Sequence, residues 1–189
     1  MDVLSVNAHF PGGNLRLRAH TLIDLLTRIP GIGTRFICIQ EGCSTLHRVL
    51  SGGPLRRTHD VYPPRSDRSG PFLITLVPHS VALSSAVTRV AFPAHMSPMR
   101  REAHVCAVGR TLLVHTHLES CGDSAHYRAA QVGYLLDIVG GHGGKLLVVG
   151  DLNGYGDWRR QHLQRGMRVE SSRRRVPVTP HFLFSHRAA

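Results

Sequence analysis

Polar residues of the kinds that bind metal ions and phosphate follow four separate apolar runs in this sequence. Asn7 follows DVLSV, Glu41 follows RFICIQ, His117 ends TLLVHTH, and Asp151 and Asn153 lie in KLLVVGDLN. A hard cation such as Mg²⁺ prefers carboxylate and amide oxygens plus water, so Glu41 and Asp151 are the natural charged ligands or water holders. An imidazole can donate to a phosphate oxygen or a leaving group. Together these groups predict chemistry at phosphorus, which depends chiefly on positioning and charge neutralisation.

Each of these residues has an ordinary explanation when taken alone. A glutamate at a strand end is more often simply exposed than a ligand, and a lone asparagine usually forms a turn. The GDLN segment by itself fits a turn after a strand. Function is favoured because four distant strands would supply the oxygen and imidazole groups that one metal site needs.

The elements that must position these residues are predicted to be strands joined by helices. Apolar side chains recur at helical spacing over residues 15–29, where a Pro-Gly pair stops the pattern. They recur again over 124–139, where Asp123 or Ser124 can cap the helix. The four apolar runs predict buried strands over residues 2–8, 35–42, 111–120 and 145–153.

The middle and the end of the chain have a different pattern. Residues 102–117 predict a hairpin with a tight Gly-Arg turn, and strands are expected before it in 70–78 and 84–93. Residues 51–70 are rich in Gly, Pro, Arg and Ser, which predicts a mobile loop. After Asn153 the pattern fades, apart from the short apolar segment HFLFSH, which predicts one last strand.

Length and composition fit one intracellular globular domain over residues 1–189. The chain has 189 residues, of which 42% are apolar, enough for a sizeable core. It has no apolar run long enough to span a bilayer, and its first residues lack the pattern of a signal peptide. Its four cysteines form no CxxC pair, so we expect reduced core or spacer thiols. The order of elements indicates an α/β (α+β) fold with a two-layer sheet arrangement and helices outside.

The chain is strongly basic, with 23 Lys and Arg against 12 Asp and Glu and a formal charge of +11. All of these cations except Lys145 are arginines, whose guanidinium groups match phosphate oxygens well. Such a charge concentrates a polyanion around the protein. A GC-rich genome and a solubility role for the charge explain the same composition without any partner.

The motifs SVN, IQEG, THLES and GDLN resemble, in order, those of the endonuclease/exonuclease/phosphatase superfamily. The resemblance is strongest to the tyrosyl-DNA phosphodiesterase 2 branch, because Arg128 and Gln131 follow THLES and a segment AFPAHMSPMRR precedes a strand. It covers residues 2–153, with a looser similarity at PHFLFSHRAA. It implies a DNase I-like two-layer β-sandwich flanked by helices and shortened at its C-terminus.

The resemblance also implies roles for individual residues. Glu41 would bind Mg²⁺ or Mn²⁺, and Asp151 would orient or deprotonate the attacking water and act as an indirect or second-site ligand. The remaining roles are phosphate contacts for Asn7, His117 and Asn153, support of the THLES strand end by Glu119, Arg128 and Gln131, and substrate binding by Arg100 or Arg101.

The chain departs from the superfamily pattern after Asn153. The Ser-Asp-His motif that normally ends these domains is missing, and residues 154–189 are divergent or truncated. His181 and His186 are the last histidines, and neither has an aspartate beside it. His186 is the candidate replacement. Loss of one such imidazole would cost about 10²–10³ in rate.

The leading hypothesis is a metal-dependent phosphodiesterase acting on nucleic acid, with DNA or a protein-linked DNA or RNA end as partner and a 5′-tyrosyl adduct as one substrate. Such an enzyme would serve DNA repair, and a basic tail, Arg173–Arg175, could direct it to the nucleus. We assume a monomer that does not bind membranes. The alternative is a catalytically impaired relic that binds nucleic acid through its arginines. A third hypothesis takes His115 and His117 as zinc ligands.

Overall fold

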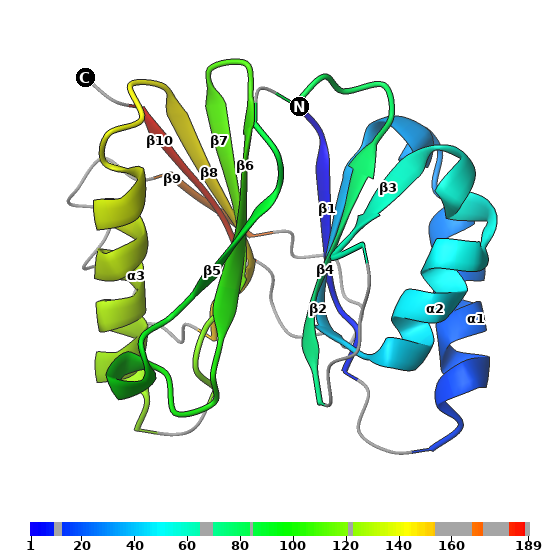
Figure 1. Cartoon of the computed structure of the whole chain (residues 1–189), viewed down its shortest axis with the longest axis horizontal. Helices are drawn as coiled ribbons and strands as arrows, with labels where there is room; N and C mark the ends of the chain where they lie inside the picture. Colours follow the sequence, from blue (N-terminus) through cyan, green and yellow to red (C-terminus); the bar gives the residue numbers. More distant parts are fainter. Residues whose placement is uncertain are drawn as a thin grey trace. The chain divides into compact units, whose positions relative to one another are not determined.

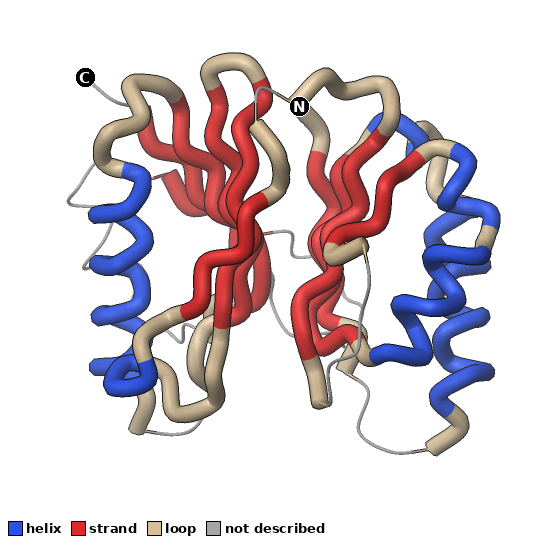
Figure 2. Tube along the Cα trace, viewed as in Figure 1, coloured by secondary structure: helices blue, strands red, loops and turns tan. Residues whose placement is uncertain are grey.

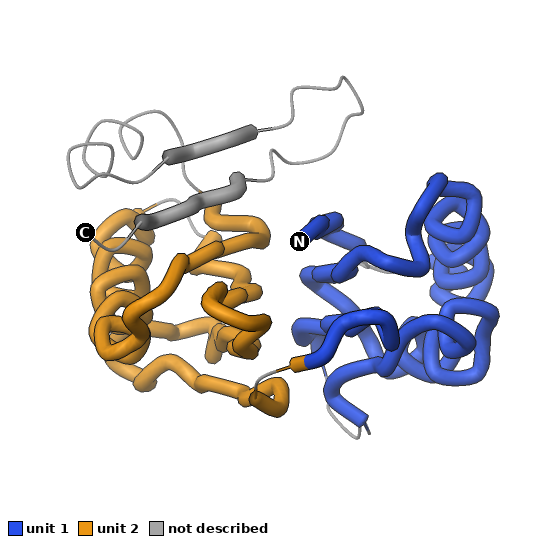
Figure 3. Tube along the Cα trace, turned by 90° about the horizontal axis from the view of Figure 1, so that it is seen from above, with its two compact units in different colours: residues 1–82 blue, residues 83–189 orange. Residues whose placement is uncertain are grey.

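The computed structural model divides the chain into two compact units, Met1–Ala82 and Leu83–Ala189, coloured separately in Figure 3. Each unit contains one sheet with helices packed on one of its faces (Figure 2). The expectation of a single domain over residues 1–189 stays a prediction. The structure describes residues 1–9, 13–64, 70–83, 85–120 and 123–153, and, for the backbone alone, 168–171 and 182–187.

The first unit contains a four-stranded sheet in the order β1-β2-β4-β3. Strands β1 and β2 are parallel, and β4 is antiparallel to both β2 and β3. Helices α1 and α2 lie along one face of this sheet (Figure 1). The elements are β1 (Val3–Asn7), α1 (Leu15–Thr27), η1 (Ile32–Thr34), β2 (Phe36–Gly42), α2 (Ser44–Gly52), η2 (Pro54–Arg57), β3 (His59–Tyr62) and β4 (Phe72–Pro78).

The core of this unit lies between the sheet and the two helices. Helix α1 begins at Asn14, whose side chain accepts a hydrogen bond from the Leu17 amide at 3.0 Å. The side chains of this core come from α1, α2, β2 and β4, and on β2 and β4 they are every second residue, as one face of a sheet requires. This core cluster includes Ala19, Ile23, Leu26, Ile37, Ile39, Leu46, Leu50, Ile74 and Leu76.

The expectation of a loop over residues 51–70 is wrong for most of that segment. The end of α2, the 3₁₀ turn η2 and strand β3 occupy it up to Tyr62, and residues 65–69 lie outside the described part of the chain. Helix α2 was missed because a Gly-Gly-Pro sequence at its end resembles a loop. Leu46 and Leu50, one helical turn apart, are fully buried and were the available signal.

The second unit contains a six-stranded sheet in the order β5-β6-β7-β8-β10-β9. Its strands pair antiparallel except for β7 and β8, which are parallel and are connected through α3. Helix α3 lies along one face of the sheet (Figure 1). The elements are β5 (Thr88–Ala91), η3 (Ala94–Met96), β6 (Glu102–Val108), β7 (Thr111–His117), α3 (Ala125–Val139), β8 (Lys145–Asp151), β9 (Arg168–Ser171) and β10 (Phe182–Arg187).

Most of the expected elements are confirmed. The four strands that carry the candidate residues, the two expected helices and the hairpin between β6 and β7 are all present. The final apolar segment forms β10, and its partner β9 was not expected from the sequence. Cys38, Cys43 and Cys106 carry thiols, and burial raises the pKa of Cys106 to about 11. Within the described residues no helix is both long and apolar enough to cross a bilayer.

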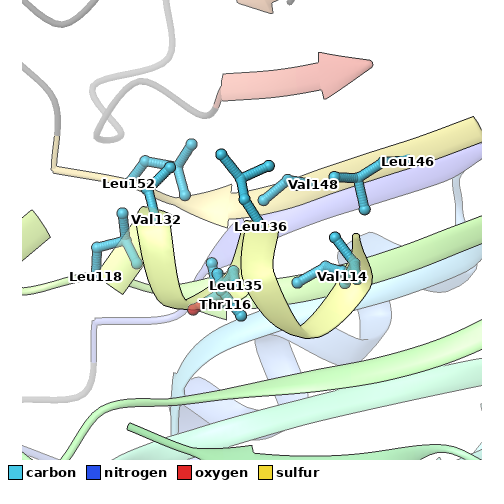
Figure 4. Close-up of a pocket in the computed structure, with 10 residues that line it drawn as sticks. Val114, Thr116, Leu118, Val132, Leu135, Leu136, Leu146, Val148 and Leu152 are labelled. Carbon is cyan, nitrogen blue, oxygen red and sulfur yellow. The ribbon is translucent and has the colours of Figure 1, made fainter. Parts of the chain in front are cut away.

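Helix α3 packs on β7 and β8 around a small apolar cavity of about 20 Å³ (Figure 4). Leucine and valine side chains of the helix and the two strands converge there, with Leu118 and Leu152 at the strand ends. A space this small holds at most one water and offers no room for a ligand. The cavity is therefore part of the core, whose role is to hold β7 and β8 side by side.

The opposite face of the same sheet carries buried histidines. His104 on β6 lies opposite His115 on β7, with ring centroids 5.8 Å apart. His117 lies two residues further along β7 and shares this face, while Thr116 points to the α3 side. Desolvation of the fully buried ring, with smaller effects of His104 and His117, holds the pKa of His115 well below its usual value.

The core around α3 makes a first prediction. Leu135 is 3% exposed and lines the small cavity, so Leu135→Ala enlarges an existing void. We expect a loss of about 2–5 kcal/mol in the free energy of unfolding, measured by urea denaturation. The matched control is Ile138→Ala on the exposed side of α3, expected within about 0.5 kcal/mol of the wild type. Equal losses for both variants would contradict the described packing.

His115 makes a second prediction, about acid sensitivity. Its folded-state pKa is lowered from the ordinary value of 6.5, so below pH 6.5 the unfolded chain binds a proton that the folded chain does not. The stability that this group contributes is complete above pH 6.5 and falls by up to about 1.4 kcal/mol per pH unit below it. We expect His115→Gln to flatten the pH dependence of urea midpoints below pH 6.5. Parallel curves for the two proteins would refute this assignment.

Candidate active site

In the first unit, the ends of β1 and β2 bring Asn7 and Glu41 together. The Asn7 Nδ2 atom donates to Glu41 Oε1 at 3.3 Å, and Asn7 Oδ1 accepts from the His9 amide at 2.9 Å. His9 Nδ1 lies 3.3 Å from Glu41 Oε2. The carboxylate is therefore held from two sides while its side chain stays 23% exposed. Glu41 and Asn7 form an oxygen-rich pair at the carboxyl end of this sheet.

Glu41 owes its orientation to an irregularity in β2. The register between β2 and β4 shifts between Ile39 and Gly42, as at a β-bulge, and Glu41 has a φ of +53°. A bulge re-aims a side chain out of the regular alternation of a strand. Gln40, the preceding residue, is fully buried and donates to the Cys38 carbonyl, while the Glu41 carboxylate reaches solvent.

In the second unit, the ends of β7 and β8 place His117 next to Asp151. These residues are paired in the parallel register, and both are 2% exposed. Gly150, which precedes Asp151, has a φ of +137°, and a Cβ atom there would lie 1.8 Å from the Thr116 carbonyl oxygen. Only glycine permits this close approach of the two strands. The glycine of this Gly-Asp sequence is thus required by the local backbone.

Hydrogen bonds join the two strand ends beyond the ladder. The Leu118 amide donates to the Asp151 carbonyl at 3.0 Å, and Asn153 Nδ2 donates to the Leu118 carbonyl at 2.9 Å. The Asn153 amide donates to Asp151 Oδ1 at 3.1 Å. These bonds fix the Asp151 carboxylate and the Asn153 side chain relative to β7. A second N–H of the Asn153 amide group remains for another acceptor.

The segment after β7 is braced from two sides. Arg128 Nη1 donates to the Glu119 carbonyl at 3.1 Å, and Gln131 Oε1 accepts from the Glu119 amide at 3.2 Å. The Glu119 carboxylate accepts from Ser97 Oγ at 2.8 Å. The three residues expected as structural support therefore all act on the same strand end. Glu119 also binds the loop before β6 through Ser97, a contact that was not expected from the sequence.

The two candidate substrate-binding arginines are placed differently. The side chain of Arg100 is exposed, at the end of a turn in which its amide donates to the Ser97 carbonyl at 2.9 Å. Arg101 is half-buried, and its Nη1 atom lies 2.9 Å from His117 Nδ1. His9 belongs to the first cluster, and Ser97 and Ser120 belong to the second. The sequence singled out none of them, because polar side chains near turns are common.

All four non-glycine residues with a left-handed backbone in the described chain belong to these clusters. They are His9, Glu41, Arg100 and Asn153, with φ between +40° and +54°. Asparagine tolerates this conformation, whereas glutamate, arginine and histidine adopt it rarely. Such residues cost free energy and concentrate at active sites and ligand clamps. Their distribution makes these strand ends candidates for a functional site without reference to any motif.

The metal expectation can be tested against the donor groups. Among the described side chains, no group of three or more His, Cys, Asp and Glu is arranged to hold a metal ion. Zinc usually takes at least three such ligands, and His117 Nδ1 already accepts from Arg101, so the zinc hypothesis gains no support. Mg²⁺ is commonly held by one or two carboxylates and several waters. Glu41 beside Asn7 fits that requirement.

The backbone of β10 places His186 away from the level of the second cluster. On β10 the backbone of His186 pairs with Leu146, near the start of β8, whereas Phe182 pairs with Gly150 at its end. At about 3.3 Å per residue, His186 is roughly four residues from the level of Phe182 and so far from Asp151 along the strand. The structure gives no support to His186 as the replacement imidazole. His181 lies outside the described residues.

A basic groove lies between α1 and α2 in the first unit. Its volume is about 460 Å³, and its lining includes the arginines Arg16 and Arg48 together with His20. No carboxylate lines it, and the floor is formed by Ile23, Val49 and the start of η2. A groove with this lining favours an anionic ligand.

Comparisons of the whole chain with known proteins give structural matches only. No family model matches the sequence, and no curated protein matches it. The fold is similar to that of truncated TDP2 from Caenorhabditis elegans, with 17% identity, a TM-score of 0.72, and coverage of 98% of this chain and 83% of that one.

Two further solved structures have the same arrangement. D. rerio TDP2, complexed with a single-strand DNA product, is 18% identical with a TM-score of 0.70 over 98% of this chain and 83% of its own. The catalytic domain of human Nocturnin, with a bound sulfate anion, is 15% identical with a TM-score of 0.64 over 97% of this chain and 80% of its own. The expected fold class is confirmed: the chain has the DNase I-like fold of the endonuclease/exonuclease/phosphatase superfamily.

Proposed function

We propose that this chain is a divalent-metal-dependent phosphodiesterase that acts on nucleic acid. The observation that carries the proposal is that each unit has left-handed backbone beside its polar cluster. In the first unit His9 and Glu41 adopt it next to Asn7, and in the second unit Arg100 and Asn153 adopt it near His117 and Asp151. Strained backbone of this kind is retained where function needs it. The fold supports the proposal, because ANGEL2, a 2′,3′-cyclic phosphatase, shares it.

The substrate class rests on charge and on similarity. A net charge of +11 attracts a polyanion, and a TDP2 of the same fold has been crystallised with a single-strand DNA product. Together with the THLES motif, these points favour a nucleic acid end, with a 5′-tyrosyl phosphodiester as the specific candidate. A role in DNA repair, and the nucleus as its location, belong to the same proposal. A fold alone does not select among such substrates.

In the proposed reaction each cluster has its own role. Glu41, supported by Asn7, would hold Mg²⁺ or Mn²⁺, which supplies positive charge to phosphate oxygens when bound. His117 and Asn153 donate hydrogen bonds to phosphate oxygens. Asp151 accepts a proton from the attacking water while the oxygen of that water forms its bond to phosphorus. The bond from phosphorus to the leaving oxygen breaks, and that oxygen takes a proton from solvent.

A second function, binding of nucleic acid without cleavage, is favoured by the basic groove between α1 and α2. Two arginines and a histidine line it, and no acid opposes them. The unmatched Ser-Asp-His motif points the same way, since a site without that imidazole loses transition-state stabilisation. If the chain is an enzyme, a change at Glu41 should lower cleavage. If it only binds nucleic acid, there is no cleavage for that change to lower.

Glu41→Gln tests the proposed enzyme. The amide keeps the size of the side chain but loses the charge that would attract the metal ion, so cleavage of a 5′-tyrosyl oligonucleotide with Mg²⁺ should fall by about 10²–10³. Calorimetric titration with Mn²⁺ should show weaker binding in the variant. Asp137→Asn, an exposed acid on α3, removes the same charge and should change neither quantity. Wild-type protein that binds the oligonucleotide but never cleaves it would establish the binding function instead.

Arg48→Gln tests the groove. The dependence of binding on salt measures how many phosphates the protein neutralises, and for a single strand one lost contact lowers the slope by about 0.7. We expect this change for single-stranded DNA in fluorescence anisotropy titrations across a salt series. The control is Arg110→Gln, at the exposed hairpin turn, which removes an equal charge. If both variants lose affinity equally, net charge rather than the groove is responsible.

A further inference from the structure

The contact between Arg101 and His117 decides which nitrogen of the histidine carries its proton. Arg101 Nη1 lies 2.9 Å from His117 Nδ1. A guanidinium has five N–H donors, no acceptor, and remains charged at any physiological pH. The histidine nitrogen in this contact must therefore be the acceptor, so Nδ1 carries no proton. A neutral imidazole then carries its proton on Nε2.

Arg101 is held in place by contacts at both ends of the residue. Its Nη2 atom donates to Ser120 Oγ at 3.2 Å, and its amide donates to Ser97 Oγ at 2.6 Å. The side chain is half-buried, which limits its alternatives. The guanidinium is therefore fixed against the ring rather than free to leave it.

The carboxylate of Glu119 organises the turn from which Arg101 projects. Glu119 Oε1 accepts from Ser97 Oγ at 2.8 Å and from the Met99 amide at 3.1 Å. Glu119 is 1% exposed, so these bonds lie in a poorly solvated environment where they are strong. Arg100, just before Arg101, has a φ of +54°. A chain of contacts thus runs from Glu119 through Ser97 and Arg101 to His117.

We propose that Arg101 is a positioning residue that fixes His117 as the neutral Nε2–H tautomer, with Glu119 and Ser97 holding the arginine in place. This inference rests on the proposed function and specifies how its imidazole works. In this state His117 offers one N–H, from Nε2, to a phosphate oxygen and gives up no proton. Protonating Nδ1 would turn an N–H toward the guanidinium and break the 2.9 Å bond. Arg101 therefore acts on the phosphate through the histidine.

The tautomer can be measured directly by long-range ¹⁵N–¹H NMR of the histidine rings in the whole chain. His117→Gln identifies the ring by the signals that disappear. In the wild type we expect Nδ1 of His117 at the shift of an unprotonated nitrogen and Nε2 at that of a protonated one. Arg101→Met removes the donors and should move both signals toward the average of two tautomers. Arg101→Lys keeps a donor-only group and should restore the wild-type pattern at least in part.

Activity gives a second readout, because a misplaced ring proton affects the reaction more than binding. Arg101→Met should lower kcat by about 10- to 100-fold with little change in KM, as expected for loss of one aligned donor. Ser97→Ala, which leaves the guanidinium intact, should shift the signals and kcat in the same direction but less. Arg110→Gln removes an equal charge at an exposed turn and should leave the NMR pattern and kcat unchanged.

Two results would overturn the inference. A wild-type His117 with its proton on Nδ1 would exclude the described contact, and an unchanged spectrum in Arg101→Met would show that the arginine does not set the tautomer. A shifted tautomer with unaltered kcat would remove the positioning role. If the wild-type protein cleaves no phosphodiester, the proposed function fails, while the NMR result still decides the tautomer. Near-ultraviolet circular dichroism of each variant verifies the fold.

Discussion

The close approach of β7 and β8 is the constraint on which the second unit depends. The Thr116 carbonyl occupies the space where any side chain at position 150 would have to lie, so glycine is required there. Helix α3 packs on one face of the same two strands, which pair in parallel. Their ends consequently carry His117 and Asp151 as neighbours, and the hydrogen bonds through Leu118 and Asn153 keep them aligned. Packing in the core thus determines the geometry of the polar groups.

Much of this architecture could be predicted from the sequence, because apolar runs that end in polar residues are a strong signal for strands. The helices α1 and α3 were equally clear from the spacing of their apolar residues. Helix α2 and strand β3 were missed because their segment is short and its glycines, prolines and arginines resemble a loop. Strand β9 lies in a basic stretch without alternation, and only its pairing with β10 reveals it.

The candidate site was partly predictable for a similar reason. Residue types and order identified Asn7, Glu41, His117, Asp151 and Asn153 as candidates, but the contacts among them come from the structure. The bulge at Glu41 has no sequence signal, since glutamate is not a residue typical of left-handed backbone. The bond from Arg101 to His117 joins positions sixteen residues apart across a hairpin and could not be derived from spacing. Their catalytic roles remain predictions.

The left-handed residues have a consequence for how such a protein evolves. Each holds the backbone in a conformation that costs about 1–2 kcal/mol for most side chains, and glycine would adopt it without that cost. Selection for thermal tolerance alone would therefore draw glycine into positions 9, 41 and 100 and would erase the polar groups there. Histidine, glutamate and arginine at those three sites therefore forgo a gain in stability that glycine would give.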